Sequence, residues 1–146
     1  MKLALAADHG GVALKDSLVR LLSDAGHEVT DLGTHGDASV DYPDFARAVA
    51  MQVRDGVVDR GILVCGTGQG MCMAANKVAG VRAGVVSDTF SARMVVEHND
   101  ARILCLGARV VGPSVAEEIV FAYLNAQFAG GRHGRRVAMI EPDGTP

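Results

Sequence analysis

The sequence contains few cysteines and no paired cysteine motif. Its three cysteines, Cys65, Cys72 and Cys105, lie far apart in the chain, and no Cys-x-x-C spacing occurs. An odd number of unpaired cysteines argues against a disulfide framework and against a structural zinc site. Free thiols are typical of proteins of the reducing cytosol, so we expect a cytoplasmic location.

Long hydrophobic segments are also absent. The apolar N-terminus extends only from Met1 to Ala7 before Asp8 and His9 follow, which is too short for the hydrophobic region of a secretory signal. No run of about 18 apolar residues occurs, so the sequence predicts no membrane-spanning helix. Linkers, repeats and low-complexity segments are lacking as well.

The chain has no excess of positive charge. Its formal net charge is −3 and its isoelectric point is about 5.9, whereas a nucleic-acid-binding protein is expected to carry a basic face. No nucleic-acid partner is therefore expected. A short basic segment at 132–136, Arg-His-Gly-Arg-Arg, suits a small anionic ligand better than a polymer.

The sequence does contain enough hydrophobic material for one folded domain. Its 146 residues are 49% hydrophobic, and a chain of about this length buries roughly 68–70% of its unfolded surface. We expect one domain over residues 1–146 that ends in a polar, basic tail at 130–146. The high apolar content also indicates an oligomer, in which another subunit covers part of the surface.

Short apolar segments alternate with longer segments of helical periodicity. Strands are expected at 2–7, 28–32, 61–65, 82–86 and 103–106, and helices at 12–22, 43–55, 71–78, 89–98 and 113–128. This alternation predicts an α/β fold, with a five-stranded parallel sheet and helices on both faces in a three-layer, Rossmann-like arrangement. Gly130, Gly131 and Gly134 disfavour a long helix in the tail.

Polar residues follow several of the expected strands. Ligands of parallel sheets bind beyond the carboxyl ends of the strands, so we expect the chemistry to converge there. These ends carry Asp8 and His9, the loop 65–70, Ser87 and Asp88, and Arg109.

The loop 65–70 is the most informative segment and reads Cys-Gly-Thr-Gly-Gln-Gly. Three glycines allow several backbone N–H groups to point toward one anion. Other glycine-rich loops fit poorly, because the dinucleotide-binding motif is one residue longer and a P-loop needs a lysine. A cysteine phosphatase would have an arginine at the position of Met71.

Cys65 is the candidate base or nucleophile of this loop. It stands where a strand ends and a helix is expected to follow, and the N-terminus of a helix favours a thiolate. Thr67 is placed to hydrogen-bond the sulfur or a substrate oxygen. Cys72 and Cys105 are expected to be small, buried packing residues.

Histidines and arginines supply the remaining candidates. His98 ends an expected helix, where it either interacts with the helix terminus or acts in a site, and His9 is better placed at the end of the first strand. Arg132 and Arg136 would share one face of a helical tail and clamp a phosphate dianion, unless they form a solvated basic tail. Arg109 is a further candidate anion contact.

Seven segments together resemble the ribose-5-phosphate isomerase B family, which also includes related sugar-phosphate isomerases. They run in order across nearly the whole chain. The segments are Ala7-Asp8-His9-Gly10-Gly11, Asp41-Tyr42-Pro43, Cys65-Gly66-Thr67-Gly68-Gln69-Gly70, Ala74-Ala75-Asn76-Lys77, His98-Asn99-Asp100, Gly107-Ala108-Arg109-Val110-Val111-Gly112 and Gly130-Gly131-Arg132-His133.

The resemblance implies an aldose–ketose isomerase that needs no metal or cofactor. The implied reaction interconverts D-ribose 5-phosphate and D-ribulose 5-phosphate through a cis-enediolate. Allose 6-phosphate, galactose 6-phosphate or a tetrose 4-phosphate are alternative substrates, and a non-catalytic sugar-phosphate-binding protein is an alternative function.

The resemblance also implies a role for each matching residue. Cys65 would move the proton between C2 and C1, Thr67 would assist it, and His98 would open the furanose ring. Backbone N–H groups of Gly66, Gly68 and Gly70 would hold the enediolate oxygen. The implied contacts are Asp8, Tyr42 and Asn99 for sugar hydroxyls, and His9, Arg109, Arg132 and Arg136 for the phosphate.

Two positions distinguish branches of the family. Some members carry a glutamate after the last loop glycine and lack the cysteine. Here that position is Met71 and Cys65 is present, so the sequence resembles the cysteine-base branch. Arg135 lies beside Arg136, and the spacing from Arg132 favours Arg136 as the second phosphate arginine.

Family members assemble as homodimers whose active sites are shared at the interface, and sometimes as pairs of dimers. The resemblance therefore implies a homodimer here, with a tetramer left open. We expect His98 and Asn99 to come from the neighbour of the subunit that supplies Cys65.

Overall fold

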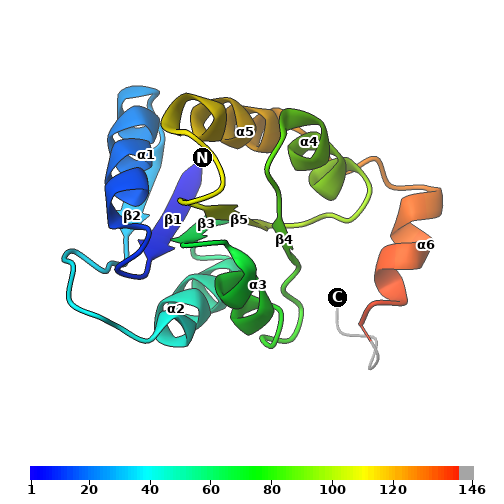
Figure 1. Cartoon of the computed structure of the whole chain (residues 1–146). Helices are drawn as coiled ribbons and strands as arrows, with labels where there is room; N and C mark the ends of the chain where they lie inside the picture. The colour runs from blue at the N-terminus through cyan, green and yellow to red at the C-terminus, as the bar shows by residue number, and fades with distance from the viewer. Residues whose placement is uncertain (142–146) are drawn as a thin grey trace.

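The computed structural model describes residues 1–141, and one parallel sheet lies at the centre of this part of the chain (Figure 1). Its order is β2-β1-β3-β5-β4, and every neighbouring pair is parallel, as predicted. The strands are β1 (Lys2–Ala7), β2 (Glu28–Asp31), β3 (Arg60–Cys65), β4 (Ala83–Val85) and β5 (Ile103–Gly107). The last residues of the expected tail, 142–146, lie outside the described residues.

Helices cover both faces of this sheet, which confirms the three-layer prediction (Figure 1). One face carries α1 (Val12–Asp24), α4 (Thr89–Glu97) and α5 (Pro113–Asn125), and the other carries α2 (Tyr42–Arg54) and α3 (Gln69–Ala75). The predicted ends were wrong for two helices. Helix α3 begins at Gln69 because Gly68, with φ +79°, ends the loop in a left-handed conformation. Helix α5 ends at Asn125 because Ala126 is extended.

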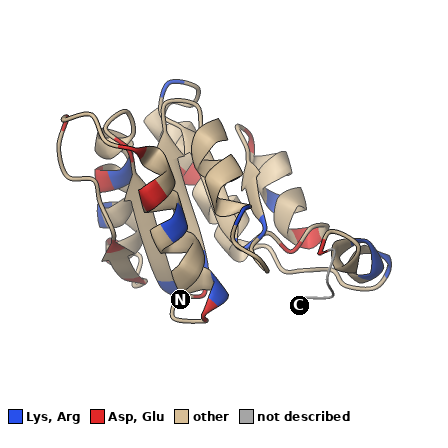
Figure 2. Cartoon of the chain, turned by 90° about the horizontal axis from the view of Figure 1, so that it is seen from below, with Lys and Arg blue, Asp and Glu red and all other residues tan. Residues whose placement is uncertain are grey.

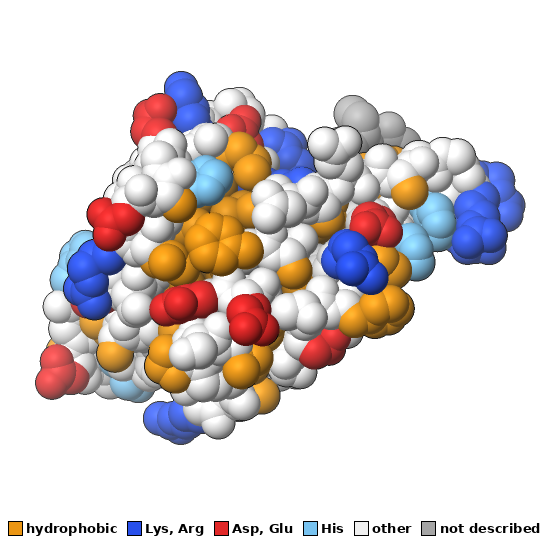
Figure 3. Space-filling view, turned by 90° about the horizontal axis from the view of Figure 1, so that it is seen from above, with side chains coloured by type: hydrophobic (Ala, Val, Ile, Leu, Met, Phe, Trp, Pro, Cys, Tyr) orange, Lys and Arg blue, Asp and Glu red, His pale blue; other side chains and the backbone are white. Residues whose placement is uncertain are grey.

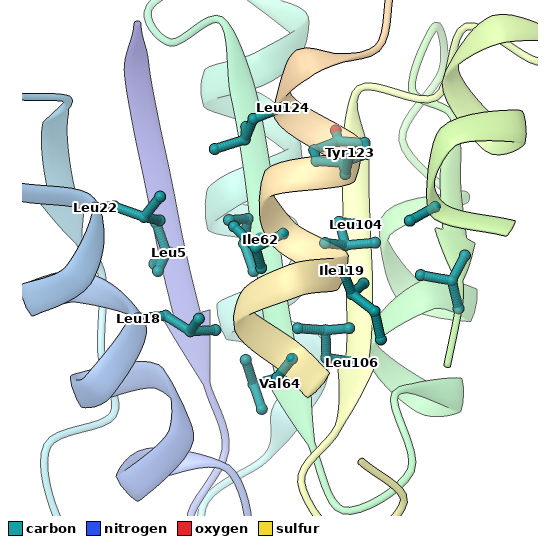
Figure 4. Packing of buried hydrophobic residues seen from close by; sticks show 14 of the residues in the cluster. Leu5, Leu18, Leu22, Ile62, Val64, Leu104, Leu106, Ile119, Tyr123 and Leu124 are labelled. Atoms are coloured by element: carbon teal, nitrogen blue, oxygen red, sulfur yellow. The ribbon is translucent and has the colours of Figure 1, made fainter. Parts of the chain in front are cut away.

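The three central strands, β1, β3 and β5, are buried on both faces because each contributes side chains alternately to two hydrophobic clusters. Leu3 and Leu5 of β1 lie in the cluster beneath α1 and α5, whereas Ala4 and Ala6 lie in the cluster beneath α2 and α3. Figure 4 shows the first cluster, in which the helices place leucine, isoleucine and tyrosine side chains against β1, β3 and β5. Because helices cover both faces of the sheet, the loops after the strands meet at its edge.

Lys15 is a buried charge within α1, with a fully covered side chain. Its ammonium group lies 2.7 Å from a carboxylate oxygen of Asp16 and 2.5 Å from one of Asp31. The other oxygen of Asp31 accepts a hydrogen bond from the Gly33 N–H at 2.9 Å. This network ties α1 to the end of β2, so that the segment after β2 runs beside the end of β1.

Backbone hydrogen bonds join the loops that follow β1, β3 and β5. The Asp8 N–H donates to the Val64 carbonyl at 3.2 Å, and the Ala108 N–H donates to the Cys65 carbonyl at 2.8 Å. The Arg109 N–H donates to the Gly66 carbonyl at 3.1 Å. Three loops from distant parts of the sequence are therefore held together at one edge of the sheet.

Replacing Gly11 with alanine is expected to lower the free energy of unfolding by about 1–3 kcal/mol, the usual effect of overpacking a tight site. A Cβ at Gly11 would lie 2.6 Å from the Val64 carbonyl oxygen and 2.8 Å from its carbon, which belong to the central strand. Urea denaturation measures the change. Gly36→Ala is the matched control, since its Cβ meets nothing within 4 Å. Equal stability of the two variants would contradict the tight contact.

Helix α6 (Arg132–Ala138) projects away from the rest of the structure (Figure 1). None of its residues is buried, and in Figure 2 much of its ribbon has the colour of Lys and Arg. Its seven residues agree with the prediction that the tail forms no long helix. Within residues 1–141, the helices are too short or too polar to cross a bilayer.

Candidate active site

A cavity of about 380 Å³ opens at the edge where the carboxyl ends of β1 and β3 meet. Its size is typical of small-molecule sites, which occupy about 300–1,000 Å³. Eight of the predicted site residues line it, and Gly10 joins them. The lining residues are Asp8, His9, Gly10, Tyr42, Cys65, Gly66, Thr67, Gly70 and Arg109.

Cys65 is the last residue of β3, and its side chain reaches the cavity from the core. The residue is only 5% exposed, and its sulfur accepts a hydrogen bond from the Gly68 N–H at 3.1 Å. Thr67, which is exposed, lies between these two residues, and its Oγ1 accepts from the Gln69 N–H at 3.5 Å. The Cys65 side chain therefore lies at the cavity and contacts the glycine loop, as the sequence predicted.

At two positions of the loop, neighbouring atoms leave too little room for a side chain. Gly68 adopts a left-handed φ of +79°, and a Cβ there would lie 3.1 Å from the carbonyl carbon of Leu106. A Cβ on Gly70 would lie 2.7 Å from the ring of Tyr42. The absence of side chains thus lets the loop pack on β5 and lets Tyr42 lie against it as one wall of the cavity.

Asp8 and His9 are both held by backbone N–H groups. A carboxylate oxygen of Asp8 accepts from the Gly10 N–H at 2.9 Å. The Nδ1 atom of His9 accepts from the Val40 N–H at 3.3 Å, which leaves the proton of a neutral imidazole on Nε2. The sequence did not reveal Val40, because its contribution is a backbone group of a polar loop. Gly10 could have been identified from its place in the first matching segment.

Arg109 supplies positive charge to the cavity. Its backbone is fixed to the Gly66 carbonyl, and a Cβ built on Gly66 would lie 3.7 Å from the Cζ of the guanidinium. The side chain is exposed, so the guanidinium can meet an anion that enters from solvent.

Five predicted site residues do not line this cavity. Gly68 belongs to the glycine loop and donates to the Cys65 sulfur; the others are His98, Asn99, Arg132 and Arg136. His98 caps the end of α4 and stacks on His133, with ring centroids 4.2 Å apart and planes at 4°. Arg132 and Arg136 are exposed and four residues apart on α6, as the sequence predicted for one face. In the space-filling view, histidine side chains lie beside Lys and Arg side chains at the projecting end (Figure 3). The predicted residues of one chain thus form two separate groups.

Arg82 holds the turn that carries His98 and Asn99. Its guanidinium donates to the Asn99 carbonyl at 3.1 Å, and it pairs with Asp100 at 2.7 Å and with Glu141 at 3.2 Å. Asp100 itself has a left-handed φ of +50°. Sequence reasoning missed Arg82, because its partners lie 17 or more residues away.

His133 is a neighbour of this turn that sequence reasoning assigned no role. Its pKa lies below the ordinary value, first because of desolvation and then because of the positive charges of His98, Arg132 and Arg136. The Nε of Arg132 donates toward its Nε2 at 3.4 Å. The second group is therefore a cationic surface on which a neutral His133 ring supports His98.

The remaining two cysteines differ from each other. Cys105 is fully buried in the core, as predicted, but the prediction of burial was wrong for Cys72, which is only partly covered and lines a second cavity. Within residues 1–141, no three His, Cys, Asp or Glu side chains are grouped so as to hold a metal ion.

Comparison with known sequences identifies relatives over almost the full length. The sequence profile of the family described as Ribose/Galactose Isomerase matches residues 3–140. The chain is 49% identical over 139 residues to ribose-5-phosphate isomerase B of Escherichia coli (strain K12), covering 95% of this chain and 93% of that protein. It is 42% identical over 142 residues to D-erythrulose-4-phosphate isomerase of Pectobacterium atrosepticum, covering 96% and 93%.

A solved structure shows the same likeness in three dimensions. The ribose-5-phosphate isomerase B of Clostridium thermocellum is 52% identical and superposes with a TM-score of 0.97, covering 98% of this chain and 97% of that one. The likeness includes the sheet and the loops at its carboxyl edge. With the resemblance of the seven segments thereby confirmed, the chain belongs to the Ribose/Galactose Isomerase family and is an isomerase.

Proposed function

We propose that this isomerase interconverts D-ribose 5-phosphate and D-ribulose 5-phosphate, with Cys65 as the base. The observation that supports this most directly is the position of the Cys65 sulfur, which faces the cavity and lies 3.1 Å from the Gly68 nitrogen. The names of the relatives from Escherichia coli and Clostridium thermocellum point to the same substrate.

In the proposed reaction the Cys65 thiolate removes the proton from C2 of the open-chain aldose. The electron pair of the C2–H bond forms the C1–C2 double bond of a cis-enediolate, and the negative charge moves to O1. The Cys65 thiol then returns the proton to C1 while the hydroxyl proton of O2 passes to O1, with Thr67 as the relay. A single base on one face of the planar intermediate suffices, because both carbons lie within its reach.

The glycine loop would stabilise the enediolate. Preorganised N–H donors at a developing oxyanion contribute about 2.7–4 kcal/mol each. The Gly68 N–H donates to the sulfur, and Gly66 and Gly70 line the cavity. Asp8 and Tyr42 line the same cavity as partners for sugar hydroxyls. Arg109 and the Nε2–H of His9 would bind the phosphate from this side.

The four predicted residues that lie apart from both the cavity and the glycine loop support a shared site. His98, Asn99, Arg132 and Arg136 would reach the cavity of a second copy, so that a homodimer forms two complete sites. Helix α6 buries none of its residues within its own chain, which is consistent with burial against a partner. In this proposal, His98 of the partner opens the furanose ring, residues 1–146 act as one domain, and a pair of dimers is an alternative assembly.

The test is turnover of four-, five- and six-carbon aldose phosphates in deuterated water, followed by proton NMR. We expect ribose 5-phosphate to be converted fastest, with deuterium incorporated at the carbon that the base serves. Binding without deuterium incorporation would instead identify a non-catalytic sugar-phosphate-binding protein, and released inorganic phosphate would identify a phosphatase.

The runner-up is an isomerase of another aldose phosphate. The Pectobacterium atrosepticum relative is named for a four-carbon substrate, and the distance from the glycine loop to the phosphate arginines would select the chain length. Faster turnover of a tetrose 4-phosphate, allose 6-phosphate or galactose 6-phosphate in the same assay would establish this alternative.

A further inference from the structure

Arg82 directly precedes β4 and contacts the turn that carries His98 and Asn99. Its backbone carbonyl accepts hydrogen bonds from the N–H groups of Arg102 and Ile103, at 3.0 and 3.2 Å, so the sheet fixes its main chain. The side chain is only 13% exposed, and each of its three guanidinium nitrogens makes a hydrogen bond. These bonds connect the sheet to the turn after α4 and to the segment after α6.

The guanidinium of Arg82 binds the turn after α4 at three points. Its Nε donates to the carbonyls of Asn99 and Asp100, at 3.1 and 3.3 Å, and its Nη2 donates to the Asp100 carboxylate at 2.7 Å. Asp100 has a left-handed φ of +50°, which residues other than glycine rarely adopt. Because His98 is the C-cap of α4 and directly precedes these acceptors, the three bonds fix the position of its ring.

The same guanidinium also holds the segment that carries Arg132 and Arg136. Its Nη1 lies 3.2 Å from a carboxylate oxygen of Glu141, whose side chain is 13% exposed and which follows the C-cap of α6 by two residues. Before α6, the Ala129 N–H donates to the Glu97 carbonyl at 3.0 Å. Helix α6 buries none of its own residues, so these contacts at its two ends keep it beside α4.

We propose that Arg82 is a positioning residue of the isomerase, which holds His98 and the two arginines of α6 in one fixed arrangement. The inference rests on the proposed function, in which these side chains open the sugar ring and bind the phosphate in the site of a second copy. Arg82 acts without touching the substrate, because all three guanidinium nitrogens already bind the protein. A lysine cannot replace it, since all donors of lysine lie on one atom.

The two directions of the reaction depend differently on this arrangement. Ribose 5-phosphate exists mainly as a furanose, so the proton of its O1 hydroxyl must pass to O4 through His98 as the C1–O4 bond breaks. Ribulose 5-phosphate carries its phosphate on O5 and cannot close a five-membered ring, so it enters the site as an open chain. Its aldehyde product closes in water without the enzyme. A displaced His98 therefore slows the reaction from the aldose alone, whereas damage to the fold slows both directions.

The test is Arg82→Met, which keeps a long side chain and removes every donor. Proton NMR follows turnover from each of the two pentose phosphates. From ribose 5-phosphate we expect kcat to fall by about 10²-fold, the effect of a misplacement of about 1 Å, and from ribulose 5-phosphate we expect kcat to stay near the native value. KM is expected to rise in both directions, because the arginines of α6 are displaced together with His98.

Two further variants separate the contacts. Glu141→Ala frees the end of α6 but leaves the bonds to Asn99 and Asp100, so we expect KM to rise while kcat from ribose 5-phosphate stays near the native value. Arg54→Met is the matched control, since this arginine lies exposed at the end of α2 and pairs with the adjacent Asp55 at 2.7 Å. Its kinetics should equal those of the native protein.

Equal losses of kcat in both directions, or no loss, in folded Arg82→Met would contradict the proposal. Circular dichroism checks the fold. If Arg82→Met does not fold, Arg82→Lys keeps the charge but has a single donor atom, and it should show the same loss from the aldose alone. Native protein that converts neither pentose phosphate would instead contradict the proposed function.

A measurement without substrate tests Arg82 independently of that function. The rings of His98 and His133 stack 4.2 Å apart, whereas His9 lies at the cavity. We expect the ring-proton NMR resonances of His98 and His133, assigned by single substitutions, to shift in Arg82→Met while those of His9 do not. Unshifted His98 and His133 resonances would overturn the role of Arg82, whichever sugar phosphate the isomerase uses.

Discussion

Replacing Cys65 with alanine is expected to lower kcat by about 10²–10⁴-fold, the range that a positioned general base contributes. The change removes the sulfur that faces the cavity and accepts the Gly68 N–H, but it leaves the glycine loop and Arg109 in place. Binding of ribose 5-phosphate is therefore expected to stay nearly unchanged. Steady-state kinetics measure kcat, and isothermal titration with the substrate measures binding to the inactive variant.

The matched control for this variant is Cys72→Ser. It removes a thiol from α3, the helix that follows the Cys65 loop, but this thiol lines the separate second cavity. We expect its kcat to equal that of the native protein. If Cys65→Ala retains near-native turnover, Cys65 is not the base; if both variants lose activity equally, the loss reflects damage to α3 rather than missing base chemistry.

The sheet and its site edge could be predicted because they depend on local patterns. Continuous apolar segments such as 2–7 and 61–65 are typical of strands buried on both faces, and parallel strands bring their ends to one edge. This is enough to bring Asp8, Cys65 and Arg109 together. The glycine loop was predictable for the same reason, since its sequence follows directly from the end of β3.

The remaining features depend on contacts between segments that no local pattern records. The Val40 N–H that holds His9 belongs to the backbone of an irregular loop. Arg82 and Asp100 meet across 18 residues. The resemblance alone divided the predicted residues between two subunits. The structure of one chain places them in two groups, which is consistent with that division.

The two groups lead to a test of assembly in which inactive proteins become active. Cys65→Ala lacks the base in one group, and His98→Ala lacks the ring-opening histidine in the other. If each site combines one group from each subunit, a mixed dimer of the two variants contains one fully native site. Random exchange of equal amounts should then restore roughly a quarter of native activity, since half of the dimers are mixed and half of their sites are intact.

In the matched control, both substitutions are placed in one chain instead of in separate chains. The double variant Cys65→Ala/His98→Ala is mixed with native protein in equal amounts, and every site of a mixed dimer then lacks one of the two groups. Activity should fall to about a quarter of that of an all-native sample, instead of the half that dilution alone predicts. Sites built within one chain would give the opposite pair of results, with no recovery in the first mixture and simple dilution in the second. The two mixtures contain the same two substitutions in the same amounts, so the difference between them reports only how the groups are distributed between subunits.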